Sequence, residues 1–390
     1  MAEWSRRSFL QSTTLAALAM RIVTEPVLAG AREKAYPQGA VIIDQNENPL
    51  GPCQAAREAV AAITPQAGRY STYLSDELTA DLARFAGLRP ECVAVFPGSS
   101  PALHHSVLAF TSRDRSYVTA DPGYEAGMFA ADYAGARVVK VPLTKDYAHD
   151  VRAMLEQAPD AGLFYICTPN NPTGTLTSHS DIEYLVEHKH KDAIVLVDEA
   201  YIHFADTTSA VDLVRAGKDV IVLHTFSKIY GMAGLRCGIA MGRPDLLEKI
   251  SAYSGWNAMP VTAVAAAMAS LKDTQLVPER KRINATVRAH TFDWLHGQGY
   301  SFIPSQSNFF LLDAKRPGKE AIDGMAAQEI FIGRIWPIMP TWVRITVGTQ
   351  EEMDRFQVAW KRVMDGTVVG KAAKKGTVSR RQLDGTVIPA

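Results

Sequence analysis

The sequence of 390 residues lacks the features that mark several protein classes. Lysine plus arginine (41) equals aspartate plus glutamate (41), so there is no basic field of the kind that drives nucleic-acid binding. No apolar run reaches the roughly 18 residues of a membrane-spanning helix. The four cysteines are widely spaced and form no C-x-x-C pair (Cys53, Cys92, Cys167, Cys237). This excludes a simple zinc or redox motif, and we predict neither a metal site nor a disulfide scaffold.

The composition that is present is that of an ordinary globular protein. Hydrophobic residues make up 47% of the chain and charged residues 21%. At roughly 150 residues per domain, the length predicts two to three domains. A chain of this length can bury a large core without disulfides or structural metals. We therefore expect no nucleic-acid partner and no membrane-spanning segment.

The N-terminus has the three parts of an export signal in their usual order. Ser5-Arg6-Arg7-Ser8-Phe9-Leu10 is followed by a short apolar stretch, and Val27-Leu28-Ala29 offers small residues for cleavage. The paired arginines before Phe-Leu resemble a twin-arginine signal, which predicts a signal peptide over residues 1–29 and a periplasmic or secreted protein. The alternative is a frayed amphipathic arm, with the protein then remaining in the cytoplasm.

The C-terminus is basic and has neither a helical nor a strand period. Residues 365–390 contain Lys371, Lys374, Lys375, Arg380 and Arg381. This composition predicts a disordered tail. A contact of the tail with a membrane surface or a partner is left open.

Seven short apolar runs alternate with helical stretches in the first part of the body. They are rich in Val and Ile and apolar on both faces, which is typical of strands buried in a mostly parallel sheet. The runs are Val93–Phe96, Tyr117–Ala120, Arg137–Val141, Gly162–Cys167, Ala193–Val197, Val220–His224 and Cys237–Met241. We predict an α/β fold with a large domain over residues 67–260.

The pattern changes after Met241 and predicts a second, smaller α+β domain over residues 261–364. Its expected helices are Val261–Leu271, Pro278–Gly297 and Glu351–Met364, and its expected strands are Ser307–Leu312 and Val343–Val347. Residues 30–66 would form an N-terminal arm and part of this small domain.

Chemically active residues follow the predicted strands, at the edge where open α/β sheets bind ligands. Asn171 follows one strand, Asp198 with Tyr201 follows the next, and Lys228 with Arg236 follows a third. Each residue alone has an ordinary explanation as a turn or surface residue. Together they are the set that holds pyridoxal 5′-phosphate.

The expected roles in that site follow from the chemistry of the cofactor. Lys228 would form the Schiff base with its aldehyde, and Asp198 would keep its pyridine nitrogen protonated, so that the ring accepts electrons from the substrate. Asn171 and Tyr201 would hydrogen-bond its phenolic oxygen, and Tyr124 could stack on the ring. The remaining predicted cofactor contacts, mostly to the phosphate, are Gly98, Ser99, Ser100, Thr225, Ser227 and Arg236.

The motifs around these residues resemble the class I/II aminotransferases of pyridoxal-phosphate fold type I. The resemblance covers about Ile42 to Val363. Its motifs are Asn171-Pro172-Thr173-Gly174, Asp198-Glu199-Ala200-Tyr201, Ser227-Lys228 and Gly234-Leu235-Arg236. Two further segments resemble the histidinol-phosphate aminotransferases, namely Asn46-Glu47-Asn48-Pro49-Leu50-Gly51 and Val343-Arg344-Ile345-Thr346-Val347-Gly348-Thr349.

This resemblance implies a homodimer with its active sites at the subunit interface. It implies that Arg344 binds the substrate's α-carboxylate and that Tyr70 reaches the cofactor phosphate of the neighbouring subunit. Arg334 matches an arginine that helps bind the substrate phosphate in the histidinol-phosphate enzymes. Asn171 would also contact the substrate.

Three tryptophans stand near the expected substrate residues. Trp336 and Trp342 lie between Arg334 and Arg344 in the sequence, and Trp256 precedes Asn257. They either pack the fold or line the pocket. In the second case they would favour an aromatic or long apolar substrate over a phosphate.

The expected function is an aminotransferase that moves an amino group from a donor to a 2-oxo acid by a ping-pong mechanism through a ketimine. The donor would be an amino acid or an amine resembling histidinol phosphate. The alternatives within the same fold are a decarboxylase and an amino acid oxidase that uses O₂. A scaffold that binds the cofactor without catalysis is the non-enzymatic alternative.

Overall fold

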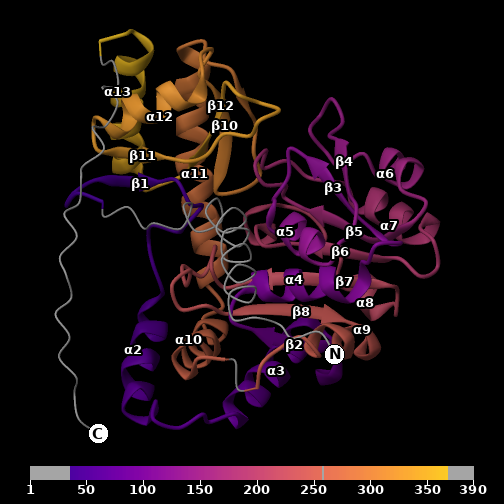
Figure 1. Cartoon of the computed structure of the whole chain (residues 1–390). Helices are drawn as coiled ribbons and strands as arrows, with labels where there is room; N and C mark the ends of the chain where they lie inside the picture. Colours follow the sequence, from indigo (N-terminus) through magenta and orange to yellow (C-terminus); the bar gives the residue numbers. More distant parts are fainter. Residues whose placement is uncertain (1–35, 257–258, 368–390) are drawn as a thin grey trace, which may run out of the picture. The chain divides into compact units, whose positions relative to one another are not determined.

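The structure is a computed structural model that describes residues 36–256 and 259–367 (Figure 1). The chain divides into two compact units, Met1–Ala40 and Val41–Ala390. The predicted signal peptide and the predicted tail from residue 368 onward lie outside the described residues. The predicted domain boundaries within Val41–Ala390 stay a prediction, and every helix and strand of the described residues belongs to this second unit.

A seven-stranded sheet forms the centre of the unit, as predicted. All strands run parallel except β8, which is antiparallel to both of its neighbours. The order is β2-β8-β7-β6-β5-β3-β4. The strands are β2 (Val93–Phe96), β3 (Ser116–Asp121), β4 (Val138–Pro142), β5 (Ala161–Cys167), β6 (Ile194–Asp198), β7 (Val220–Thr225) and β8 (Gly238–Gly242).

Both faces of this sheet are buried because alternate residues of each strand enter different cores. In β6, Val195 and Val197 join one apolar cluster, whereas Ile194 and Leu196 join another. This explains why the strands read as continuous apolar runs rather than as alternating patterns. The mostly parallel α/β fold predicted from these runs is confirmed.

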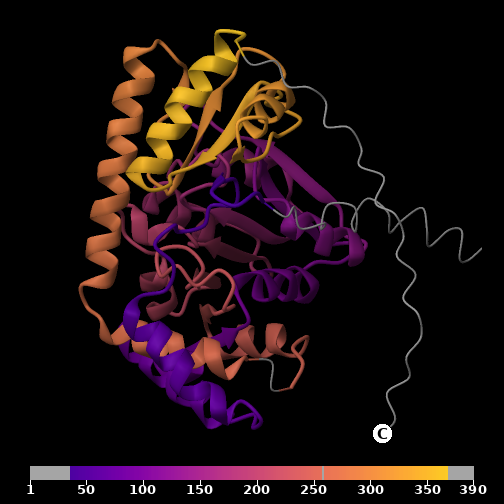
Figure 2. The same ribbon diagram turned by 90° about the vertical axis from the view of Figure 1, so that its left-hand side faces the viewer.

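Helices supply the other side of each core (Figure 1). One face is covered by α4 (Ser99–Phe110), α5 (Ala126–Tyr133) and α9 (Pro244–Ser251). The other core is built from α2 (Gln54–Ile63), α3 (Tyr73–Ala86), α6 (Val151–Gln157), α7 (His179–His188), α8 (Val211–Arg215) and α10 (Val261–Lys272). Figures 1 and 2 both show α2 beside α10, two helices distant in sequence.

A third core holds the remaining elements. The long helix α11 (Leu276–Gly297) runs beside them in Figure 2. The elements are β1 (Val41–Ile43), β9 (Phe302–Ile303), β10 (Phe309–Asp313), β11 (Ile330–Ile332), β12 (Trp342–Thr346), α12 (Gly318–Ala326) and α13 (Gln350–Met364). Strands β9, β10 and β12 form an antiparallel sheet, and β1 pairs in parallel with β11.

The pairing of β1 with β11 is a feature that the sequence analysis missed. Each strand has only three residues, which is too short to show a periodic pattern. The pair brings the segment that follows β1, residues 44–51, next to β12 and its continuation. Within residues 36–256 and 259–367, no helix combines the length and the apolar character needed to cross a membrane.

Candidate active site

The carboxyl ends of three neighbouring strands bring the central predicted residues to one edge of the sheet. Cys167 of β5 is in register with Asp198 of β6, and Asp198 with Leu223 of β7. Asp198 is the last residue of its strand rather than the first residue after it. The ammonium nitrogen of Lys228 lies 5.5 Å from the centre of the Tyr201 ring. The loops after β6 and β7 therefore meet above this edge.

Asp198 is a buried carboxylate held by two hydrogen bonds. Tyr165 Oη donates to Oδ2 at 2.9 Å, and the backbone N–H of Ala200 donates to Oδ1 at 3.1 Å. Its side chain forms no ion pair with a lysine or arginine among the described residues. Burial raises the pKa of Asp198, although these hydrogen bonds and the charges of His224 and Lys228 act in the opposite direction. A cationic N–H beside Asp198 would relieve this cost.

Lys228 projects toward the segment that follows β1. Its Nζ donates to the carbonyl oxygen of Gln45 at 3.3 Å. Burial and the positive charge of Arg344 lower the pKa of Lys228 to about 8. A larger fraction of this amine is therefore neutral near neutral pH than of an ordinary lysine, and a nucleophile and a proton acceptor both require the neutral form.

The predicted phosphate contacts gather at the N-terminus of α4. Gly98 is the N-cap residue, with φ of 94°, and a Cβ at this position would overlap Nη2 of Arg236. The backbone of Gly98 therefore lies directly against the Arg236 guanidinium. Arg236 Nη1 also donates to Ser227 Oγ at 3.3 Å, and Thr225 Oγ1 donates to the same oxygen at 3.0 Å. A helix N-terminus combined with a guanidinium and hydroxyls is a donor set for a phosphate.

Arg344 lies buried in β12 and faces the same region, with 4% of its surface exposed. Its Nη1 donates to Asn171 Oδ1 at 2.8 Å, and its Nη2 donates to the Asp44 carbonyl oxygen at 2.8 Å. Its Nε is buried and has no hydrogen-bond partner among the described residues. Burial lowers the pKa of Arg344 to about 10, so the group stays charged at neutral pH. A buried guanidinium with a donor to spare is suited to an anion.

Tyr201 is held by the segment between β1 and α2. Its hydroxyl accepts a hydrogen bond from Asn46 Nδ2 at 3.1 Å, and its ring packs edge-on against Phe309 at 4.8 Å. Asn46 is fixed in turn by Thr346, whose hydroxyl accepts from the Asn46 backbone N–H at 2.9 Å. Tyr124 is half-buried and hydrogen-bonds Ser100 at the start of α4.

One of the predicted residues, Tyr70, is not gathered with the others in this chain, and another, Arg334, lies at the exposed rim of the site. Tyr70 is 75% exposed, and no hydrogen bond, ion pair or ring contact in the described residues joins it to the cofactor set. Arg334 is exposed but close by, and its Nη2 lies 2.5 Å from Glu125 Oε1. Of the tryptophans, Trp336 is buried and Trp256 is 96% exposed.

The sequence analysis did not identify three side chains near the site, those of Tyr165, Glu199 and His224. Tyr165 bonds Asp198 from the neighbouring strand, and a buried tyrosine two residues before a strand end was a signal for it. Glu199 is fully buried and lies 2.7 Å from His224 Nε2. Because Glu199 follows Asp198, this pair anchors the chain next to the buried carboxylate. Cys167 and Cys237 are buried, and both pack into the apolar cores.

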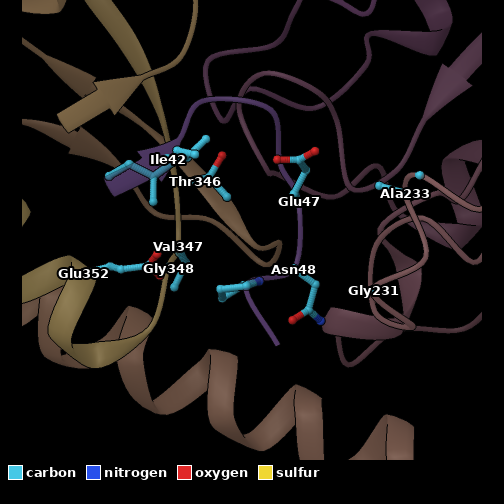
Figure 3. Close-up of a pocket in the computed structure, with 12 residues that line it drawn as sticks. Ile42, Glu47, Asn48, Gly231, Ala233, Thr346, Val347, Gly348 and Glu352 are labelled. Atoms are coloured by element: carbon cyan, nitrogen blue, oxygen red, sulfur yellow. The ribbon is translucent and has the colours of Figure 1, made fainter. Parts of the chain in front are cut away.

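A cavity of about 340 Å³ lies beside the segment that carries Glu47 and Asn48. Figure 3 shows Asn48 between the chain at Gly231 and the chain at Gly348. The Asn48 amide donates to the Ile229 carbonyl oxygen at 3.0 Å, next to Lys228. The charge of Glu47 also acts on Lys228. This cavity therefore borders the segment that supports the lysine.

Comparison with known proteins matches the chain to one family over most of its length. The family described as "Aminotransferase class I and II" matches residues 40–359. The chain is 33% identical to a histidinol-phosphate aminotransferase of Symbiobacterium thermophilum, over 83% of this chain and 90% of that protein. It is 31% identical to an aromatic amino acid aminotransferase of Cutibacterium acnes, over 85% of this chain and 95% of the relative.

A solved structure shows the same relationship. The histidinol-phosphate aminotransferase of Sinorhizobium meliloti, determined in complex with pyridoxal-5′-phosphate, superposes with a TM-score of 0.77 at 25% identity. The match covers 84% of this chain and 92% of that one. The family match, the two relatives and the shared fold agree with one another. The chain therefore belongs to the class I and II aminotransferases.

Proposed function

We propose that this aminotransferase uses pyridoxal 5′-phosphate to move an amino group from an amino donor to a 2-oxo acid. The observation that carries the proposal is the placement of Lys228 beside Asp198, with the buried guanidinium of Arg344 facing them. The donor is an amino acid or an amine resembling histidinol phosphate, since relatives are named for each kind of substrate.

The residues present fit the cofactor. Burial raises the pKa of the Asp198 carboxyl, and a protonated ring nitrogen beside it would favour the charged form. The N-terminus of α4, pressed against Arg236 at Gly98, would hold the phosphate. Lys228 has the lowered pKa of a lysine that reacts with an aldehyde.

Each residue then has a task that its surroundings support. When bound, the cofactor supplies an aldehyde and a ring that accepts electrons from the donor's α-carbon. Arg344 orients the donor's anionic group, and Asn171 holds Arg344 in place. Asp198 keeps the ring nitrogen charged, and Tyr165 keeps Asp198 ionised. Lys228 takes the proton from the donor's α-carbon as a neutral amine.

The test is a single-donor reaction without an acceptor. Purified full-length protein loaded with pyridoxal phosphate is mixed with one amino donor at a time, and the cofactor is recovered and identified. Stoichiometric formation of pyridoxamine phosphate is expected with one class of donors. Lys228→Ala should abolish this conversion, whereas Lys218→Ala, at an exposed position, should not. Release of CO₂ or uptake of O₂ without pyridoxamine phosphate would contradict the proposal.

We also propose that the active unit is a homodimer. Tyr70 is exposed and has no contact with the cofactor set of its own chain among the described residues. In a dimer, its hydroxyl would instead reach the cofactor phosphate bound by the second copy. Other large apolar side chains are exposed as well, among them Tyr73 at 56% and Trp256 at 96%. Such side chains are commonly covered in assemblies.

Export by the twin-arginine route is a further proposal. It is supported by the paired Arg6 and Arg7 and by the small residues around Ala29, all outside the described residues. Replacing both arginines by lysine should retain the full-length precursor inside the cell. Fractionation of cells that express the original chain should find a shortened protein outside the cytoplasm. Equal distribution of both proteins would contradict export.

A further inference from the structure

Two guanidinium groups lie against a single tryptophan at the substrate side of the site. The centre of the Trp336 ring is 4.9 Å from the Arg334 guanidinium and 5.6 Å from that of Arg344. Trp336 is 2% exposed, and its Nε1 donates to the Gly123 carbonyl oxygen at 3.0 Å. The indole is therefore a fixed platform that keeps the two positive charges close to each other.

Only one of these two arginines is free to bind an anion. Arg334 Nη2 lies 2.5 Å from Glu125 Oε1, with Glu125 placed just before α5 on the large-sheet side. The side-chain hydrogen bonds of Arg344 go to an amide oxygen and a backbone carbonyl, neither of them charged. The charges of Glu125 and Asp44 also act on Arg344. The anion end of the pocket thus carries much less positive charge than two free arginines would give.

We propose that Glu125 sets the anion specificity of this aminotransferase by occupying Arg334, so that the site binds an α-amino carboxylate and rejects the phosphate ester of an amino alcohol. The inference rests on the proposed function, because it names the substrate class of the same site. Glu125 is a specificity-determining residue in this view, acting through the arginine that it neutralises.

The physical reason lies in the charge of the two substrate classes. A carboxylate carries one negative charge, which the bidentate fork of Arg344 matches. A phosphate monoester carries about −1.5 to −2 at neutral pH and has three acceptor oxygens. It would need Arg334 as a second partner and would be repelled by the Glu125 carboxylate next to it. Repulsion between like charges is an effective way to exclude a competing ligand.

The test compares two ligands that share a phenylethyl group and end either in a carboxylate or in a phosphate ester of a CH₂OH group. 3-Phenylpropionate and 3-phenylpropyl phosphate both lack an amino group, so their binding requires no turnover. Dissociation constants are measured by calorimetry with the full-length protein loaded with pyridoxal phosphate. We expect the original protein to bind the carboxylate about tenfold more tightly than the phosphate. Glu125→Gln should strengthen phosphate binding about tenfold and change carboxylate binding by less than about twofold.

Two further variants assign the effect to the ion pair. Adding Arg334→Gln to Glu125→Gln should remove the gain in phosphate binding, because the gain comes from the released arginine. Asp323→Asn breaks the exposed ion pair with Lys319 and should leave both constants unchanged. This matched control shows whether the loss of any carboxylate matters.

Three results would overturn the inference. They are a preference of the original protein for the phosphate, an unchanged phosphate affinity in Glu125→Gln, and failure of the original protein to bind either ligand. If the single-donor reaction fails but the expected affinities are found, only the proposed reaction is wrong. If that reaction succeeds and Glu125→Gln changes nothing, only this inference is wrong.

Discussion

The buried Asp198 depends on a hydroxyl from the neighbouring strand. The Tyr165 hydrogen bond helps to keep this carboxylate ionised against the effect of burial. Tyr165→Phe should raise the pKa of Asp198 further and weaken its pairing with a protonated ring nitrogen. We expect the dissociation constant of pyridoxal phosphate to rise about tenfold, since a hydrogen bond to a charged group contributes about 1.5–3 kcal/mol.

The control for this change is another buried tyrosine of the same sheet. Tyr117 lies 6.2 Å from Tyr165, ring to ring, but its hydroxyl does not bond Asp198. Tyr117→Phe should leave cofactor affinity within about twofold. An absorbance titration of cofactor-free protein with pyridoxal phosphate measures the dissociation constant for both variants. Equal effects of both substitutions would show that packing rather than the hydrogen bond controls affinity.

Lys228 should show its lowered pKa in the rate at which it captures the cofactor. Only the neutral amine attacks an aldehyde, and a pKa of about 8 means that the neutral form accumulates as the pH rises through 8. Capture of pyridoxal phosphate by cofactor-free protein should therefore be about tenfold faster at pH 9 than at pH 7. Stopped-flow absorbance measures this rate. A rise of about a hundredfold, still steep at pH 9, would indicate an ordinary lysine pKa near 10.4 and would contradict the lowered pKa.

At the scale of elements, helix α11 fastens the segment after β1 to the loop that carries the lysine. Arg280 is 6% exposed, and it donates to the Gly51 carbonyl oxygen at 2.6 Å and to that of Ile229 at 3.0 Å. Ile229 directly follows Lys228, and its carbonyl also accepts the Asn48 amide. The Arg280 guanidinium thus connects three segments, namely helix α11, the segment after β1 and the loop that carries Lys228.

Replacing Arg280 should therefore cost stability as well as order around the lysine. Arg280→Met removes a charged donor from the buried Ile229 carbonyl and from the half-buried Gly51 carbonyl, and we expect the free energy of unfolding to fall by about 2–3 kcal/mol. Arg282→Met on the same helix is exposed and should change it by less than about 0.5 kcal/mol. Denaturant unfolding of the two variants compares them. Equal midpoints would argue against the three-segment clamp.

At the scale of the whole molecule, the position of Tyr70 leads to a test of shared active sites. If Tyr70 serves the partner's cofactor, Lys228→Ala and Tyr70→Phe chains should both be impaired alone. A mixed dimer would contain one site with an intact Lys228 and an intact Tyr70 from the other chain. Refolding the two variants together should restore up to about a quarter of the original activity, because about half of the dimers are mixed and each has one intact site.

The outcome without restoration is equally informative. If mixing gives only the average of the separate activities, Tyr70 acts within its own chain or not at all. For the full-length protein, light scattering should find a mass about twice the 42.6 kDa of one chain, as a dimer requires. A mass of a single chain would contradict the homodimer at once.

Local patterns were enough to predict the large sheet and the kind of chemistry at its edge. The strands are buried on both faces, so each appears in the sequence as a short apolar run, and β2 and β7 begin at the predicted residues. Parallel strands in such a sheet end at one edge, so Asn171, Asp198 and Lys228 could be placed together without a structure. Short strands such as β1 and β11 carry no such pattern and were missed.

The sequence by itself therefore determined the α/β architecture and the residues suited to pyridoxal phosphate, because burial and strand-end chemistry are local properties. The tertiary structure alone decided which groups control those residues. These groups are hydrogen-bonded although they are distant in the sequence. Tyr165 and Asp198 are 33 positions apart, Asn171 and Arg344 are 173 apart, and Glu125 and Arg334 are 209 apart. Such contacts depend on strand register and on how separate elements pack. A change of a few ångströms in that packing would leave the motifs intact and free Arg334 for a different substrate.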